Sequence, residues 1–297
     1  MRRKAYIGVV ALAAILICAA AIIHIVRAQA FMAEAGRMAE RFAAQRLGTD
    51  VHIGTVEIRS LHELTIDDIV VYDKQADVVL RADEARVTLR LLSLLLSPET
   101  SVDEVLLTGA HAHIVQRADG SWNYNDLAAD DTEPSTFEGR IRLADATAEI
   151  ETGARSYELT DITGTADIDR GDLSYDLTAA LAGVPVRVRG ENVGGTRELQ
   201  LMLDDSELTP LLDLLPSGAI SEDVRVQKLH AAHVNASMRW VDGTFTAEGR
   251  AAGVTAAADV YGTQTQIESA ALTFSERELF LAATAEARSE ERRNGAY

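Results

Sequence analysis

Two histidines, His111 and His113, have the spacing best suited to binding a metal ion. Residues two apart on a β-strand point to the same side of the sheet, so both imidazole rings could reach one ion. No third ligand accompanies them at a defined spacing, and isolated pairs of this kind commonly lie on protein surfaces. The sequence therefore predicts no metal site and no cofactor.

Pairs of aspartates are the other groups that could do chemistry, as catalytic carboxylates. They are Asp67 with Asp68, Asp130 with Asp131, and Asp204 with Asp205. We interpret all of them as acids in loops or turns. The sequence also lacks the Gly-x-Ser-x-Gly, P-loop and His-Glu-x-x-His motifs. We therefore expect that the protein is not an enzyme.

Charge is distributed unevenly along the 297 residues, whose formal net charge is −18. Residues 1–47 carry about +5 and the remainder about −23. An acidic body repels phosphate backbones, so nucleic acid is excluded as an expected partner. The basic end suits contact with anionic lipid head groups. The composition, 47% hydrophobic and 25% charged, is that of a folded protein.

Residues 5–26 are apolar except for His24, and residues 1–27 are predicted to form a transmembrane anchor. Twenty-two helical residues span roughly 33 Å, enough for a hydrocarbon core of about 30 Å. A cleaved signal peptide is the alternative, because Ala28-Gln29-Ala30 resembles a cleavage site. The apolar run exceeds a signal core of about 7–15 residues, which favours the anchor. Arg2, Arg3 and Lys4 favour a cytoplasmic N-terminus and an extracytoplasmic body.

Residues 28–47 are predicted to form an amphipathic helix that stops at Gly48. Phe31, Ala35, Met38, Phe42 and Leu47 fall close to one face of this helix. It could lie on the membrane surface or cover the first open edge of a following sheet, and we favour the second role.

From Val51 onward, apolar and polar residues alternate with a period of two, which is typical of half-buried antiparallel strands. Val184, Val186 and Val188, for example, alternate with Arg187 and Arg189. We predict a mainly β protein with one elongated, open, curved antiparallel sheet and few short helices. One face of this sheet is expected to be apolar, and its lining residues are Leu173, Tyr175, Leu177, Val184, Val186, Val188, Val234, Met238, Phe245, Leu279 and Leu281.

The predicted β-rich body has two parts. The polar, acidic stretch 128–137 is expected to be a linker between an N-terminal β-module (48–127) and a repetitive β-region (138–287), with a charged tail at 288–297. A short helix is predicted from Thr209 to Leu215. The apolar run 92–98 is expected to be a short element tucked against the sheet.

Residues 106–127 read LLTGAHAHIVQRADGSWNYNDL and end in a recurrent signature. Together with the upstream strands and the anchor, they resemble the N-terminal region of AsmA-like and TamB-like proteins. The matching residues are Asp119, Gly120, Trp122, Asn123, Asp126 and Leu127, preceded by Arg117. The resemblance covers residues 1–127 well. The remaining residues share only the repetitive β pattern. The family's large C-terminal domain has no counterpart here. The resemblance therefore implies a short member of the family or a truncated copy.

The resemblance implies an envelope protein of the bridge-like lipid-transfer type, held in the inner membrane with its body in the periplasm. The apolar face would form a taco-like β-groove that carries phospholipid acyl chains between the inner and outer membrane. The expected partners are phospholipid and the inner membrane. One alternative is an assembly factor for outer-membrane β-barrel proteins that acts by β-augmentation, with an outer-membrane protein as partner. A passive envelope scaffold is the other.

Overall fold

The computed structural model describes residues 47–60, 62–90, 102–127, 138–153, 155–215, 220–221, 223–241, 244–261, 263–274 and 279–288, with residues 37, 40, 41, 43 and 44 before them. The predicted anchor, the apolar run 92–98, the linker 128–137 and nearly all of the tail 288–297 lie outside these residues. Among the described residues, no helix combines the length and the apolar character that a membrane crossing requires.

The described chain is mainly β, as the alternating sequence predicts. The strands are β1 (Val51–Ser60), β2 (Glu63–Tyr72), β3 (Val78–Leu89), β4 (Val102–Thr108), β5 (His111–Gln116), β6 (Glu138–Thr152), β7 (Arg155–Asp169), β8 (Asp172–Leu181), β9 (Val184–Val193), β10 (Thr196–Glu207), β11 (Val224–Val241), β12 (Thr244–Val260), β13 (Thr263–Phe274) and β14 (Leu279–Arg288). Two 3-10 helices interrupt them, η2 (Asn123–Leu127) and η3 (Thr209–Leu214). The second confirms the short helix predicted from Thr209.

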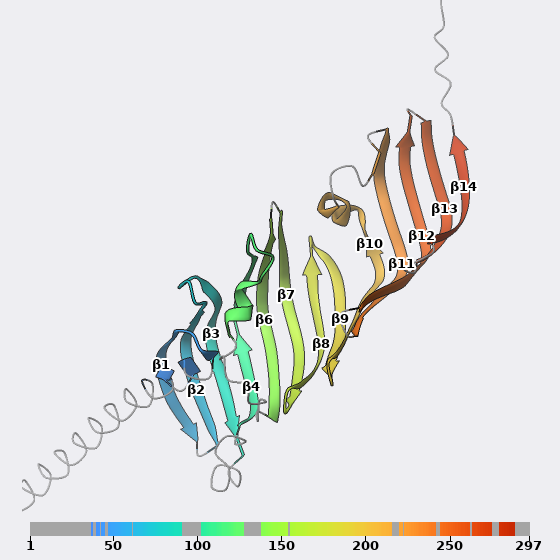
Figure 1. The fold of residues 1–297 in the computed structure, drawn as a ribbon. Coiled ribbons are helices and arrows are strands. Elements are labelled where there is room, and N and C mark those ends of the chain that lie inside the picture. The colour runs from blue at the N-terminus through green and yellow to red at the C-terminus, as the bar shows by residue number, and fades with distance from the viewer. Residues whose placement is uncertain are drawn as a thin grey trace, which may run out of the picture.

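All of these strands belong to one sheet, and nearly every strand pairs with its neighbour in the chain. Figure 1 shows the strands side by side in one long curved sheet from β1 to β14. Strands β4 and β5 share one place between β3 and β6. At about 4.8 Å between neighbouring strands, the thirteen places along the sheet extend over roughly 60 Å.

The prediction of a purely antiparallel sheet is wrong at one joint. Strands β4 and β5 both run parallel to β6, with Leu107 opposite Leu143 and His113 opposite Glu149. A parallel pair needs a long crossover, and the chain between Gln116 and Glu138 supplies it. The two predicted parts of the body therefore join in a single sheet at β6.

The helix before β1 ends as predicted. Gly48 has φ 68°, and its N–H donates to the Ala44 carbonyl at 2.8 Å. Glu40 of this helix accepts a hydrogen bond from the Ile53 N–H of β1 at 2.9 Å. The same carboxylate lies 3.2 Å from Nδ1 of His52. The helix thus contacts the first strand of the sheet, as the edge-covering role requires.

Candidate functional site

Residues opposite each other in a β-ladder point to the same side, so the register assigns each residue to a face. Between β8 and β9, Leu177 lies opposite Val188, Ala179 opposite Val186, and Leu181 opposite Val184. The register continues to Leu173 and Tyr175, so the predicted lining residues of these two strands share one face. We call this side of the sheet the inner face.

The inner face continues into the C-terminal strands. Leu201 of β10 lies opposite both Val188 of β9 and Ala236 of β11. Leu199 lies opposite Met238, and Leu203 opposite Val234. Three further predicted residues are in the same register, because Phe245 pairs with Trp240, Leu281 with Leu272 and Leu279 with Phe274.

The inner face also continues to the N-terminal edge of the sheet. Leu177 is opposite Gly164 of β7, which is opposite Leu143 of β6. Leu143 leads through Leu107 to β3, and from there to the apolar residues of β2 and β1. Polar residues on this face, such as Thr152, Arg155, Asn192 and Arg197, are found mainly near strand ends.

Irregular positions lie at a similar level in several strands on both sides of β8 and β9, and they bend these strands. Asp68, Asp145, Asp161 and Asp205 lie inside strands, yet their φ angles are 53°, 54°, 53° and 45°. Positive φ is uncommon outside glycine, and aspartate is among the residues that tolerate it best. With their neighbours in adjacent strands they form what we call the kink line: Gly54, Asp68, Asp83, Gly109, Asp145, Asp161, Asp205, Ala232 and Gly253.

At the kink line, the alternation of inner and outer residues shifts by one. In β6, Leu143 and Ala146 both join the inner face, with two residues between them instead of one. In β10 the buried residues Leu203 and Ser206 show the same step. Bulges of this kind bend a strand and increase its twist. Because many strands bend at the same level, the sheet folds along the line while its apolar face stays inside.

The kink line corrects one prediction. Asp67 with Asp68 and Asp204 with Asp205 were expected in loops or turns, but they lie within β2 and β10. Asp130 and Asp131 lie outside the described residues. Gly253 shows how closely the strands approach here, since a Cβ at this position would lie 2.7 Å from the Cβ of Ala232. Glycine also permits the φ of 60° that the chain adopts there.

Side chains from both sides of the kink line pack together on the inner face. One cluster joins Ala82, Ala110 and Ala146 with Leu80 and Leu107. A second joins Ala179, Val184, Val186 and Leu203 and extends to Leu159 and Val234. Most other inner-face residues are only half-buried, as expected where the described strands form one sheet and no second sheet packs on its apolar side.

Helix η3 covers part of the inner face. Its Leu211 and the preceding Leu208 pack on the second cluster, and Val184 and Val186 are only 3% and 5% exposed. Arg155 of β7 donates to the Leu214 carbonyl at 3.4 Å, and the Leu229 N–H of β11 donates to Thr209 Oγ1 at 2.8 Å. The helix therefore bridges β7 and β11 across the turn between β8 and β9. Val184 and Val186 lie in a closed core, whereas Leu173, Tyr175, Leu177, Val188, Val234 and Met238 are half-buried.

Aromatic residues occupy two distinct places on this face. Tyr175 lies directly over Gly190 of β9, where any larger residue would collide with its ring. At the C-terminal end of β11, the ring of Trp240 contacts the ring of Phe245 of β12, with centroids 5.0 Å apart. Phe245 is 49% exposed, so this pair forms an apolar rim at the β11–β12 hairpin.

The opposite, outer face is covered by ion pairs. Asp176 accepts two hydrogen bonds from Arg187, at 2.8 and 2.6 Å, and one from Arg189 at 2.9 Å. These bonds, above all those from Arg187, lower the pKa of Asp176 to about 2. Similar pairs join Arg140 to Asp167 and Arg239 to Glu198. The predicted division into an apolar and a charged face is therefore present in the described strands.

The signature residues tie the end of β5 to the turn between β2 and β3. Asn123 is 3% exposed; its Oδ1 accepts the Val115 N–H at 3.0 Å, and its Nδ2 donates to the His113 carbonyl at 2.8 Å. Arg117 donates to Asp73 at 2.8 Å and to Asp126 at 2.6 Å. The bond from Arg117 lowers the pKa of Asp126, and the Ser121 hydroxyl lowers that of Asp119.

The remaining signature residues complete the same turn. Gly120 has φ 86°, and its N–H donates to the Arg117 carbonyl at 2.9 Å. Trp122 stacks on Tyr124 with centroids 5.9 Å apart, and Leu127 ends η2. The contacts of the signature described above thus lie within the fold, and its residues are remote in sequence from the lining of β8 to β12.

No protein-family model, curated protein or solved structure matches this chain.

Proposed function

We propose that the inner face binds the acyl chains of phospholipids and guides them along the sheet, between the two membranes of a bacterial envelope. The observation that carries this proposal is the continuity of the apolar face. It extends by register from Ile53 in β1 through Leu143, Leu177 and Leu201 to Leu272 in β13. The sequence resemblance to AsmA-like and TamB-like proteins supports the same function.

The energetics of lipid transfer favour such a surface. Moving an acyl chain of about sixteen carbons into water costs roughly 13 kcal/mol, at about 0.8 kcal/mol for each methylene. A half-buried aliphatic face offsets much of this cost without forming any specific polar contact. A catalytic group is not needed for this task. The anchor predicted at residues 1–27 would hold the sheet at the inner membrane.

Neighbouring residues of β10 provide a matched test. Leu201 lies on the inner face, and Gln200 lies on the outer face opposite Arg189. Aspartate at Leu201 places a charge in the path of an acyl chain and should abolish lipid recovery. Aspartate at Gln200 adds the same charge beside an arginine and should leave lipid recovery unchanged.

The measurement is mass spectrometry of the lipids that remain with the purified full-length chain. Circular dichroism verifies that both variants keep their β-structure. The proposal fails if the folded wild-type chain carries no phospholipid, or if the two variants carry equal amounts.

Assembly of outer-membrane β-barrels is a second candidate, supported by the end of the strand order. Among the described strands β14 pairs only with β13, so a further strand could add beside it. Cross-linking from β14 to an outer-membrane protein, together with unchanged lipid content in Leu201→Asp, would favour this function over lipid transfer.

A further inference from the structure

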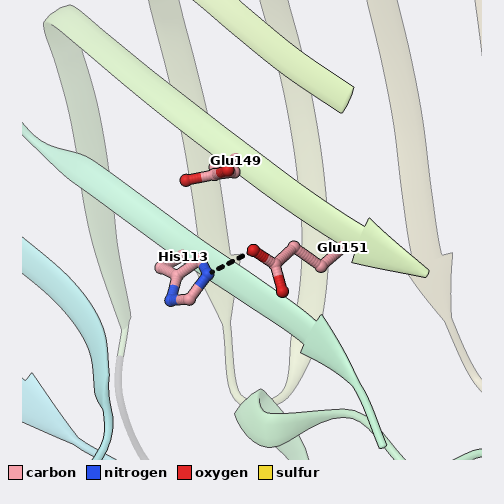
Figure 2. A group of neighbouring side chains, drawn as sticks. All are labelled: His113, Glu149 and Glu151. Carbon is pink, nitrogen blue, oxygen red and sulfur yellow. Dashed lines mark ion pairs between the residues drawn. The ribbon is translucent and has the colours of Figure 1, made fainter. Parts of the chain in front are cut away.

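Three metal-ligating side chains meet on the outer face at the parallel joint of the sheet. His113 of β5 lies opposite Glu149 of β6, and Glu151 follows two residues later on the same side. Their neighbours Ile114 and Ile150 are register partners on the inner face. Figure 2 shows the three side chains gathered beside these two strands. Within the described residues, no other set of three or more His, Cys, Asp or Glu side chains has this closeness.

The distances in this cluster suit a shared ion. Nε2 of His113 lies 3.3 Å from Oε1 of Glu151, and one ligand atom from each residue lies within 4.8 Å of the others. Tetrahedral zinc has bonds of about 2.0–2.2 Å, which places adjacent ligand atoms roughly 3.3 Å apart. The His113–Glu151 pair has this separation already. Glu149 would need to rotate about its side-chain bonds to bring a carboxylate oxygen to this separation.

The local charge also favours a cation. Glu149 lies opposite Glu158 of β7, and like charges directly opposite each other destabilise a sheet. In the part of the chain that the structure describes, neither Glu149 nor Glu151 is paired with an arginine or lysine. Elsewhere on the outer face, Asp167, Asp176 and Glu198 each have an arginine partner.

Other side chains hold the carboxylate and the strand in place. The Ser156 hydroxyl donates to Oε1 of Glu149 at 3.0 Å. His111, on the same side of β5, has its Nδ1 2.8 Å from the Thr147 hydroxyl. Hydrogen bonds of this kind orient ligands around metal centres. The side chains of His113 and Glu151 are 35% and 44% exposed, so an ion can reach them from solvent.

We propose that His113, Glu149 and Glu151 bind a divalent transition-metal ion of the zinc class, with water as the remaining ligand. One imidazole and two carboxylates form a donor set that zinc accepts and that magnesium and calcium, which prefer oxygen, do not favour. The ion would fasten β5 to β6 at the one parallel joint of the sheet. This inference is independent of the proposed lipid function.

Zinc binding to the full-length chain, purified without a histidine tag, tests the proposal by isothermal titration calorimetry with zinc chloride. The variants are His113→Asn, Glu149→Gln and Glu151→Gln, which keep side-chain size and remove a ligand atom. His233→Asn is the control, because His233 lies 2.8 Å from a single carboxylate, that of Asp204. Circular dichroism verifies the fold of each variant.

We expect one zinc ion per chain, bound at least tenfold more weakly by each of the three variants and equally well by the control. Absence of zinc binding at 100-fold molar excess would overturn the proposal. So would wild-type binding by folded His113→Asn, or calcium binding as tight as that of zinc.

Discussion

At the scale of single residues, the signature near η2 has a structural role that its sequence does not display. Asn123 satisfies two backbone groups of β5 from a nearly inaccessible position. These two hydrogen bonds fix the position of η2 against β5. The bond from Arg117 to Asp73 could not be predicted, because Asp73 lies 44 residues away and only the fold brings it close.

Asn123→Ala should destabilise the fold, because it leaves the part-buried Val115 N–H and His113 carbonyl without their partner. Each unpaired buried group costs about 1–3 kcal/mol, so we expect a loss of roughly 2–4 kcal/mol. Urea unfolding followed by circular dichroism measures the loss. Asn125→Ala is the matched control, because Asn125 is exposed two residues away. Equal stability of the two variants would show that the Asn123 contacts contribute little.

Low pH should remove the stabilisation that the ionised Asp176 carboxylate gives through its bonds to Arg187 and Arg189. Its pKa falls from an ordinary 3.8 to about 2 in the folded protein, so its stabilising effect is complete above about pH 4. That effect is lost as the pH falls from 4 towards 2. The melting temperature of Asp176→Asn should therefore lie a few degrees at most below that of the wild type at pH 6, and the two should converge near pH 2.

A suitable control for Asp176→Asn is Asp213→Asn, since Asp213 is exposed on η3 and has no ion pair among the described residues. Its melting temperature should follow the wild type over the whole pH range. A gap between Asp176→Asn and the wild type that widens on acidification would contradict the assignment.

At the scale of elements, the alternating pattern predicted most strands, because side chains on a half-covered sheet must alternate. The kink line could not be predicted in this way. A left-handed aspartate breaks the alternation, and in sequence it resembles a turn, as with Asp68 and Asp205. The parallel joint was missed for another reason, since pairing between β5 and β6 depends on a crossover and leaves no local pattern. The cluster of His113, Glu149 and Glu151 at this joint was missed with it.

Asp161 offers a direct test of the kink line, since its φ of 53° suits glycine and strongly disfavours β-branched residues. Asp161→Val should destabilise the sheet by about 1–2 kcal/mol or more. Asp161→Gly should stay within about 1 kcal/mol of the wild type. Urea unfolding measures both. Thr165→Val is the control in the same strand, where extended backbone accepts valine. Valine tolerated equally at both positions would show that Asp161 is not strained.

At the scale of the whole molecule, the structure is one curved sheet with an apolar inner face and a charged outer face. The sequence predicted both faces. The register extends the inner face beyond the predicted lining residues, to Leu143 and Leu107 in the N-terminal strands. The cover formed by η3 was not predicted, because a short helix gives no sign of what it packs against. Its contacts close the inner face near Val186, whereas Leu177, Val188 and Leu201 of the same strands stay half-buried and keep the apolar face continuous.

Photo-cross-linking in living cells tests the central claim, that acyl chains lie along the inner face, most directly. A photoreactive phenylalanine analogue replaces one inner residue in each of several strands, namely Leu143, Leu177, Leu201 and Met238. The neighbouring outer residues Arg142, Thr178, Gln200 and Ser237 serve as controls. Phospholipid adducts, detected by mass spectrometry, should form at all four inner positions and at none of the outer ones. Adducts absent from the inner positions, or equally frequent on both faces, would contradict the account.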